Sequence, residues 1–267
     1  MDLGLAGSKA VVTGGSKGMG LAIAQTLAAE GASVAVMARN RAALDAAVES
    51  LYEAGAPDAV GISVDMVDGA SIAAGFSMVF ERWGQLNSLV HTIGPGDGYF
   101  EEMDDAQWDA AFVLGTMSGV RCVRAALPML RTADWARIVT LSAHSIQRQN
   151  PRIVAYTASK AALSSITKNL SKSLAKDGIL VNCICPGTIV TASFTEQLKD
   201  VLAAEGLDAT NPHDVMSWID THFHQPCDLG RAGLPEEIAS ITTYLASRRN
   251  GYVTGATVNV DGGSDFI

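Results

Sequence analysis

Short apolar runs rich in Val, Ile and Leu alternate with amphipathic stretches along the whole chain. The runs span residues 9–13, 33–38, 59–64, 88–93, 137–141, 180–184 and 256–260. Because they are continuously apolar, they are typical of strands buried on both faces of a parallel sheet. Helical periodicity covers about 18–30, 41–54, 70–83, 104–131, 156–177 and 235–246. The pattern predicts one α/β domain, a doubly wound parallel sheet of about seven strands with right-handed crossovers.

The helix predicted over 104–131 is unusually long. It contains Pro128, which we expect to kink it or end a turn. Gly115 and Gly119 lie four residues apart within it. Small residues at this spacing either permit a neighbouring helix to approach closely or are merely tolerated, and the sequence leaves both interpretations open.

Two further segments interrupt the alternation of strands and helices. Residues 142–155 form a polar loop between a strand and a helix. Residues 192–230 form a connection of nearly forty residues, too long for an ordinary loop. Because this insert is rich in apolar residues, we expect a helical lid that closes over an apolar substrate. The alternative is a pair of small helices packed permanently on the core.

Composition narrows the possible ligands. The net charge of −9 argues against a nucleic-acid partner, since such proteins collect Lys and Arg to neutralise phosphates. Any anionic ligand must therefore be held locally. The 26 glycines among 267 residues exceed the usual share of about 7%, while there are only 8 prolines. This excess indicates a backbone that something approaches closely.

The sequence carries no recognised signal for export or membrane insertion. The first fifteen residues, MDLGLAGSKAVVTGG, lack a basic flank followed by a long apolar run. No window reaches about 18 uninterrupted apolar residues, so we expect no membrane span and a cytoplasmic location. The cysteines have no spacing typical of a disulfide framework or zinc site, and reduced thiols are expected. They are Cys122, Cys227 and the alternating pair Cys183 and Cys185, which we expect to be buried packing residues.

A glycine-rich turn, TGGSKGMG over residues 13–20, joins the first predicted strand to the first helix. Glycines at such a turn let a pyrophosphate approach the backbone, and the helix N-terminus supplies unpaired N–H groups with a partial positive charge. A glycine-rich turn without a ligand is the alternative. The position between a strand and a helix favours a dinucleotide site.

The end of the second strand bears on cofactor choice. An acidic residue there would accept a hydrogen bond from the ribose 2′-hydroxyl, whereas Arg accommodates a 2′-phosphate. The chain has Ala38 and Arg39 at this place, with Lys17 in the nearby turn. We therefore expect NADP(H) rather than NAD(H). If Arg39 is only a solvated helix-start residue, cofactor choice would be loose.

Tyr156 and Lys160 lie one helical turn apart near the start of the helix predicted over 156–177. An ammonium beside a phenol stabilises the phenolate and lowers the phenol pKa, which suits an acid/base for an alcohol–carbonyl pair. Alone, a Tyr-x-x-x-Lys spacing is common. Together with the glycine-rich turn, it resembles the short-chain dehydrogenase/reductase family over essentially the whole chain, in particular its NADP-preferring 3-oxoacyl reductases.

The resemblance implies a Rossmann-type fold and a set of site residues. Tyr156 would be the acid/base, Lys160 would lower its pKa and bind the nicotinamide ribose, and Ser142 would polarise the carbonyl. The implied cofactor-binding residues are Gly14, Ser16, Lys17, Gly18, Met19, Arg39, Asp65, Met66, Thr92, Gly94, Tyr156, Lys160, Pro186, Ile189 and Thr191.

The chain departs from the family pattern in three places. The family's Asn-Asn-Ala-Gly after the fourth strand reads HTIG over 91–94, keeping only the glycine. Gly115 stands where the family has an Asn that supports a proton relay. The family's catalytic Ser aligns with Ala143, so that Ser142, Ser145 or no serine could serve.

These residues predict an NADP(H)-dependent oxidoreductase that acts on CH–OH or C=O groups of a small molecule. Two alternatives remain: an enoyl-thioester reductase, and a cofactor-binding protein that has lost catalysis. His213, His222 and His224 lie in the insert, but we expect no metal site. The family resemblance also implies a homo-oligomer, a tetramer or dimer, with which Gly115, Gly119 and the segment 260–267 are compatible.

Overall fold

A seven-stranded parallel sheet forms the centre of the molecule. The computed structural model describes residues 2–96 and 98–264. The strand order is β3-β2-β1-β4-β5-β6-β7 and every neighbouring pair is parallel. The strands are β1 (Lys9–Thr13), β2 (Ser33–Ala38), β3 (Ala59–Ser63), β4 (Ser88–His91), β5 (Ala136–Leu141), β6 (Ile179–Pro186) and β7 (Thr257–Val260). The predicted doubly wound sheet is confirmed.

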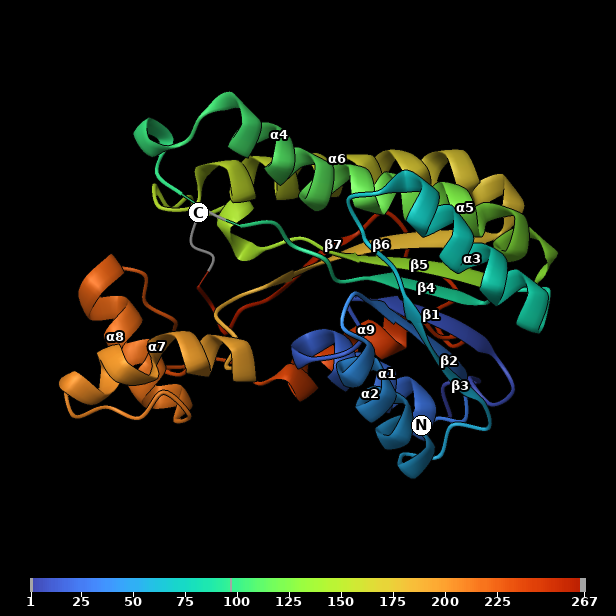
Figure 1. Cartoon of the computed structure of the whole chain (residues 1–267), viewed down its shortest axis with the longest axis horizontal. Helices are drawn as coiled ribbons and strands as arrows, with labels where there is room; N and C mark the ends of the chain where they lie inside the picture. The colour runs from blue at the N-terminus through green and yellow to red at the C-terminus, as the bar shows by residue number, and fades with distance from the viewer. Residues whose placement is uncertain (1, 97, 265–267) are drawn as a thin grey trace.

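Helices cover both faces of this sheet (Figure 1). One face is covered by α1 (Gly18–Ala29), α2 (Arg41–Glu53) and α9 (Pro235–Leu245). The other is covered by α3 (Gly69–Trp83), α5 (Ser118–Thr132) and α6 (Val154–Leu174), with α4 (Asp105–Phe112) leading into α5.

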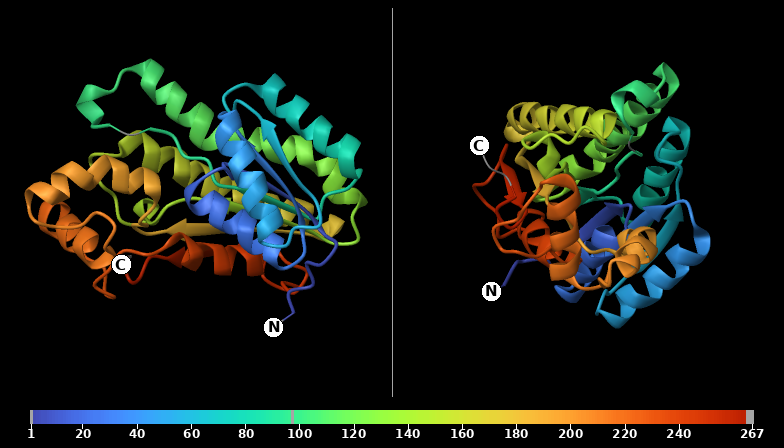
Figure 2. Two further views of the ribbon diagram at one scale, coloured as in Figure 1. Left: turned by 60° about the horizontal axis from the view of Figure 1, so that its bottom comes forward. Right: turned by 90° about the vertical axis from the view of Figure 1, so that its left-hand side faces the viewer.

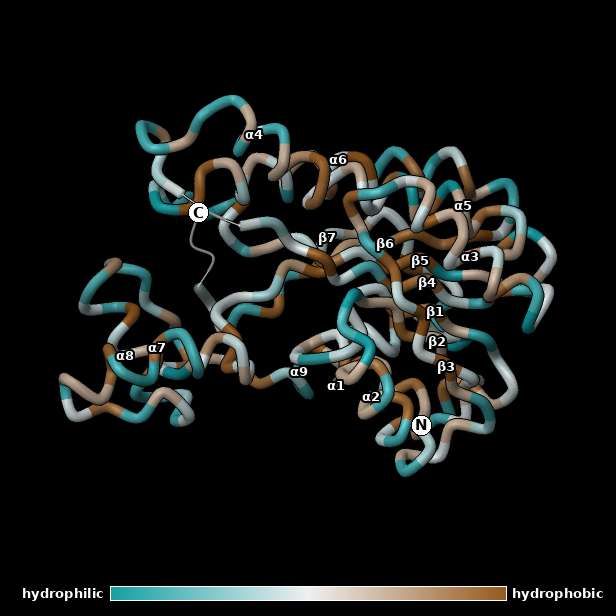
Figure 3. Tube along the Cα trace, in the orientation of Figure 1, coloured by the Kyte–Doolittle hydropathy of each residue, from teal (hydrophilic) through white to brown (hydrophobic). Residues whose placement is uncertain are grey.

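The continuous apolarity of the strands follows from this layering. Val12 and Val36 belong to the core on the α1 side, whereas their neighbours Val11 and Met37 belong to the core on the α3 side. All four side chains are fully buried. Since successive side chains of a strand point to opposite faces, a strand covered on both faces needs apolar residues at every position. The apolar residues follow the strands in Figure 3.

The strand order positions the site. β1 pairs with β2 on one side and with β4 on the other, so the chain reverses its direction of travel across the sheet between β1 and β4. In open α/β sheets a ligand binds in the crevice outside the carboxyl ends of the strands at this reversal.

The long predicted helix is interrupted by a π-helical turn, Val113–Met117, between α4 and α5. α5 then continues through Pro128 to Thr132, so the irregularity includes Gly115 and does not fall at the proline. The run Asp105–Thr132 is long and apolar enough to cross a membrane by length and composition, as core helices also can be. It contributes Cys122, Ala126 and Met129 to the core on the α3 side.

The insert forms two helices, α7 (Ala192–Ala204) and α8 (Pro212–Phe223), which project from one end of the sheet (Figures 1 and 2). They have an apolar cluster of their own, formed by residues between 190 and 232. Trp218, Ile219 and Leu202 are buried within it. The apolar side chains that we expected to face a substrate are therefore largely used to hold the insert together. Residues 265–267 of the apolar C-terminal segment lie outside the described residues.

Candidate active site

The glycine-rich turn is shaped by its glycines. Gly14 adopts a φ of +74°, which favours glycine, and its N–H donates to the carbonyl of Met37 on β2 at 2.8 Å. A Cβ at Gly20 would lie 2.3 Å from the carbonyl oxygen of Gly14. The turn therefore folds tightly against the start of α1, whose first turn carries no acidic residue. This leaves the positive end of the helix available to an anion.

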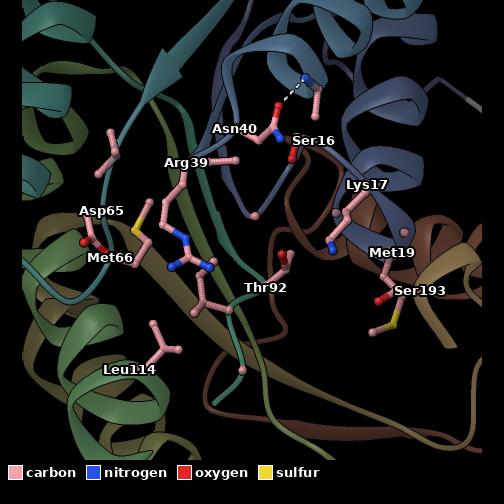
Figure 4. Close-up of a pocket in the computed structure, with 18 of the residues that line it drawn as sticks. Ser16, Lys17, Met19, Arg39, Asn40, Asp65, Met66, Thr92, Leu114 and Ser193 are labelled. Carbon is pink, nitrogen blue, oxygen red and sulfur yellow. Dashed lines mark hydrogen bonds between the residues drawn. The ribbon is translucent and has the colours of Figure 1, made fainter. Parts of the chain in front are cut away.

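A cleft of about 520 Å³ opens at this turn. It brings together most of the predicted cofactor-binding residues (Figure 4). Those that line it are Gly14, Ser16, Lys17, Gly18, Met19, Arg39, Asp65, Met66, Thr92, Gly94 and Thr191. Thr191 also caps the N-terminus of α7, accepting from the N–H of Phe194 at 3.2 Å, so the insert begins at the edge of the cleft.

Two cations face the cleft, Arg39 from the end of β2 and Lys17 from the glycine-rich turn (Figure 4). Both are exposed. Neither forms an ion pair with a carboxylate among the residues that the structure describes. Asp65, on the wall formed after β3, accepts the N–H of Val67 at 3.2 Å. The cleft thus offers two positive charges to a ligand, although the net charge of the protein is −9.

Tyr156, Lys160 and Gly94 meet where the cleft ends. A Cβ at Gly94 would lie 3.3 Å from Cε2 of Tyr156 and 3.6 Å from Cε of Lys160. The Lys160 ammonium lies 5.9 Å from the centre of the Tyr156 ring. α6 begins at Val154, two residues earlier than predicted, so Tyr156 lies in its first turn.

Lys160 is buried and held by the backbone. Its Nζ donates to the carbonyls of Ile93 at 2.7 Å and Leu141 at 2.6 Å. Burial lowers its pKa from 10.5 to about 8, against an opposing electrostatic effect of Cys183 and Cys185. The two carbonyls come from segments following β4 and at the end of β5, so the sheet fixes the ammonium beneath the phenol ring.

His91, which replaces the first Asn of the family pattern, is a buried structural residue that the sequence alone did not reveal. The hydroxyl of Ser118 donates to the carbonyl of Leu114 and can therefore accept from Nε2–H of His91 at 3.1 Å. The other ring nitrogen, Nδ1, then accepts from the Thr13 hydroxyl at 2.8 Å. Burial, aided by the charge of Lys160, lowers the pKa of His91 to about 3. A neutral imidazole thus joins β1, β4 and α5.

Two glycines of the long helix make room for this arrangement. A Cβ at Gly119 would lie 2.9 Å from Cδ1 of Leu163 and 3.3 Å from Cδ2 of His91. A Cβ at Gly115 would lie 2.3 Å from the Ser159 hydroxyl and 3.1 Å from Cδ of Pro95. Both glycines therefore serve close packing. The space next to Gly115, where the family's relay Asn would begin, is filled by neighbouring atoms.

Two serines of the 142–155 loop are buried and hydrogen-bonded within the protein. Ser142 is 3% exposed, and its hydroxyl donates to the carbonyl of Lys160 at 2.8 Å. The hydroxyl of Ser145 is also buried, accepting from Thr157 at 3.0 Å. Neither lines the cleft. The hydroxyl that we expected at the substrate carbonyl is instead bonded to the backbone of α6.

The segment after β6 is held from both sides. The carbonyl of Pro186 accepts from Nδ1 of His144 at 3.1 Å. Ile189 pairs with Gly233 in an isolated parallel bridge, which joins the entry and exit of the insert. Pro186 and Ile189 do not line the cleft, and Ile189 lines a separate hollow beside Gly233.

The histidines of the insert have local partners. His213 Nδ1 lies 3.0 Å from the carbonyl of Gly230, and His222 pairs with Glu205 at 3.1 Å. Over the described ranges 2–96 and 98–264, no group of three or more His, Cys, Asp or Glu side chains is placed to hold a metal. Cys183 and Cys185 are fully buried in β6, as predicted.

The fold and the site define a dinucleotide-binding α/β protein of the oxidoreductase type, and comparison with known proteins agrees. A family model described as enoyl-(acyl carrier protein) reductase matches residues 14–265. Dehydrogenase/reductase SDR family member 4 of Caenorhabditis elegans is 32% identical over 96% of this chain and 95% of its own length. A 3-oxoacyl-[acyl-carrier-protein] reductase FabG of Chlamydia trachomatis is 31% identical, covering 97% of this chain and 98% of its own.

Among solved structures, L-sorbose reductase from Gluconobacter frateurii, complexed with NADPH and L-sorbose, superposes with a TM-score of 0.93. It is 31% identical and the match covers 100% of both chains. This chain therefore belongs to the short-chain dehydrogenase/reductase family of oxidoreductases.

Proposed function

We propose that this protein is an NADP(H)-dependent oxidoreductase that interconverts a carbonyl and an alcohol, with Tyr156 as the acid/base. The observation that carries the proposal is the meeting of Tyr156, Lys160 and Gly94 at the end of a cleft that begins at the glycine-rich turn. Two of the similar solved structures, L-sorbose reductase and an actinorhodin polyketide ketoreductase variant, are complexes with NADPH.

The cleft fits a phosphorylated dinucleotide. Its volume of about 520 Å³ lies within the range of about 300–1,000 Å³ usual for small-molecule sites. The N-terminus of α1 would bind the pyrophosphate, and Arg39 with Lys17 would bind a 2′-phosphate. When bound, NADPH would supply the hydride.

The remaining chemistry comes from the chain. Tyr156 gives a proton to the carbonyl oxygen during reduction and takes it back during oxidation. The ammonium of Lys160, fixed by the carbonyls of Ile93 and Leu141, stabilises the phenolate form of Tyr156. We assign no carbonyl-polarising role to Ser142, because its hydroxyl hydrogen is already donated to the carbonyl of Lys160.

The insert is proposed to close over the substrate as a lid. Its own apolar cluster lets it move as a unit. Its two ends are joined by backbone hydrogen bonds from Val190 to Gly233 and from Gly233 to Thr188, both 2.9 Å. Closure about this ladder would require the bonds that tie the end of the insert to its surroundings to open, among them those from Arg148 to the carbonyl of His224 and from the N–H of Leu229 to the carbonyl of Gly262.

The catalytic assignment is tested by Tyr156→Phe, with Tyr252→Phe as the matched control because Tyr252 is 99% exposed. NADPH oxidation is followed against quinones, ketones, 3-oxoacyl thioesters and enoyl thioesters. Tyr156→Phe should lose about 10²–10⁴-fold in kcat while NADPH binding, measured by fluorescence titration, is retained. Full activity in Tyr156→Phe refutes the role. Turnover of enoyl thioesters alone would favour an enoyl reductase, and NADPH binding without any turnover a protein that has lost catalysis.

Cofactor preference is tested separately. Wild type should have a higher kcat/KM with NADPH than with NADH. Arg39→Asp should reverse this preference, since an acid repels the 2′-phosphate and accepts from a 2′-hydroxyl. Arg249→Asp is the charge-matched control, because Arg249 is exposed and does not line the cleft. A wild-type preference for NADH contradicts the assignment.

A further inference from the structure

A second hollow, of about 260 Å³, lies between the loop that precedes α6 and the end of α8. We call it the basic pocket. Its lining residues are Arg148, Gln149, Asn150, Pro151, Arg152, His222, Phe223, His224 and Gln225. Two arginines and two histidines are its titratable side chains, and none of these described lining residues is acidic. This is unusual in a chain whose net charge is −9.

Arg152 is held in this pocket by aromatic rings. Its guanidinium carbon lies 4.4 Å from the ring centre of Phe223, at the end of α8, and 5.7 Å from that of Tyr99. A guanidinium stacked on a ring keeps its N–H groups in its own plane, directed outward, where they can bind an anion in a bidentate manner. Within residues 2–96 and 98–264, this guanidinium donates no hydrogen bond and forms no ion pair.

Hydrogen bonds from Arg148 join the segments around Arg152. Arg148 donates to the carbonyls of His224 at 2.9 Å and Ser264 at 3.1 Å, tying together the loop, the insert and the C-terminal segment. His224 has a φ of +52°, and it is the one described non-glycine residue with a positive φ. It is the left-handed C-cap that ends α8, and its N–H donates to the carbonyl of Asp220 at 2.9 Å. His222 pairs with Glu205, the acidic group on that side of the pocket.

The basic pocket and Tyr156 both lie at the start of α6, with Arg152 two residues before the helix begins and Tyr156 in its first turn. Arg152 precedes Tyr156 by four residues, so their Cα atoms are at most about 14 Å apart. The intervening Ile153 forms a parallel bridge with Gly98, and the N–H of Val154 donates to the Gly98 carbonyl at 3.4 Å. A substrate whose carbonyl reaches Tyr156 would extend along the start of α6 to reach Arg152.

We propose that the basic pocket binds an anionic group, a carboxylate or a phosphate, carried by the carbonyl substrate, with Arg152 as its principal contact. This inference deepens the proposed function and rests on it. The structure of the insert supports this proposal. Its apolar side chains pack on one another, and Phe223 at the end of α8 holds the Arg152 guanidinium in the basic pocket. A positive site on an acidic protein also selects against neutral competitors, since charge complementarity sets specificity.

Two matched substrate pairs test the proposal and separate the sources of the charge. Levulinate and its methyl ester differ by a carboxylate, whereas acetoacetyl-pantetheine and its phosphorylated form differ by a phosphate. The quantity measured is the ratio of kcat/KM for the anionic member to that for the neutral member. Wild type should favour the anionic member of at least one pair, and Arg152→Met should lower that ratio by about 10- to 100-fold, the usual effect of a lost charge-assisted hydrogen bond. Arg249→Met should leave it unchanged.

A purely structural role for Arg152, holding the insert by stacking, predicts a different result. In that case Arg152→Met would lower kcat/KM for neutral and anionic members alike, leaving the ratio unchanged, and the proposal would be overturned. A wild-type ratio near one for both pairs would also overturn it.

Binding measurements keep the inference distinct from the proposed function. If wild type turns over none of the four compounds, the proposed function fails, and calorimetry then measures levulinate and its methyl ester binding to the protein with NADPH present. A preference for levulinate that Arg152→Met removes supports the basic pocket. Equal binding of the two compounds refutes it.

Discussion

Replacing Lys160 by methionine should change the pH dependence of stability in a defined window. The ammonium is buried, and burial lowers its pKa from 10.5 to about 8. A unit of pKa corresponds to about 1.4 kcal/mol, so this lowering corresponds to about 3 kcal/mol. Between pH 8 and 10.5 the unfolded chain holds the Lys160 proton and the folded chain does not. Since the unfolded state binds more protons, the wild type gains stability as pH rises through this window.

Urea denaturation of two proteins that differ by Lys160→Met, from pH 6 to 11, measures the effect. Both proteins carry Tyr156→Phe, because the ammonium is proposed to lower the pKa of Tyr156. The remaining lysines and tyrosines titrate in both, so the difference between the two free energies of unfolding reports on Lys160. This difference should be constant below about pH 8. Between pH 8 and 10.5 the free energy of unfolding of the protein with Lys160 should rise by about 3 kcal/mol relative to that of the Lys160→Met variant. The carbonyls of Ile93 and Leu141, which lose their donor in the variant, add an offset that does not depend on pH. A difference that stays flat from pH 8 to 10.5 would show that burial does not lower the pKa of Lys160.

Three further predictions concern other parts of the chain. Gly115→Asn should destabilise the fold by about 1–3 kcal/mol in urea denaturation, because its Cβ would lie 2.3 Å from the Ser159 hydroxyl; unchanged stability would mean that this contact yields freely. Ser142→Ala should cost about 1 kcal/mol, the worth of its bond to the carbonyl of Lys160, and change kcat by less than about threefold; a hundredfold fall in kcat would make Ser142 catalytic after all. If the chain forms the expected tetramer or dimer through its long helix, Phe112→Glu should shift the sedimentation coefficient toward the monomer, since this side chain is 37% exposed; a monomeric wild type contradicts the expectation.

The helices of the insert show how far a sequence pattern can be followed. The length of the 192–230 connection and its apolar residues predicted a helical insert, and α7 and α8 lie within it. The contacts of its apolar side chains depend on how α7 and α8 pack against each other. Trp218 and Leu202 belong to one buried apolar cluster within the insert. The local sequence pattern does not distinguish side chains packed in such a cluster from side chains that face a substrate.

The sequence by itself determined the layered sheet, the glycine-rich turn and the helical spacing of Tyr156 and Lys160. Each depends on near neighbours along the chain, because strand alternation, turn geometry and helical pitch are local properties. Only the tertiary structure decided where individual polar groups point. The Ser142 hydroxyl donates to a carbonyl eighteen residues away, and His91 contacts Thr13 and Ser118 on two other elements. A buried hydrogen bond is set by the partner that folding brings within reach, and chain order alone does not specify that partner.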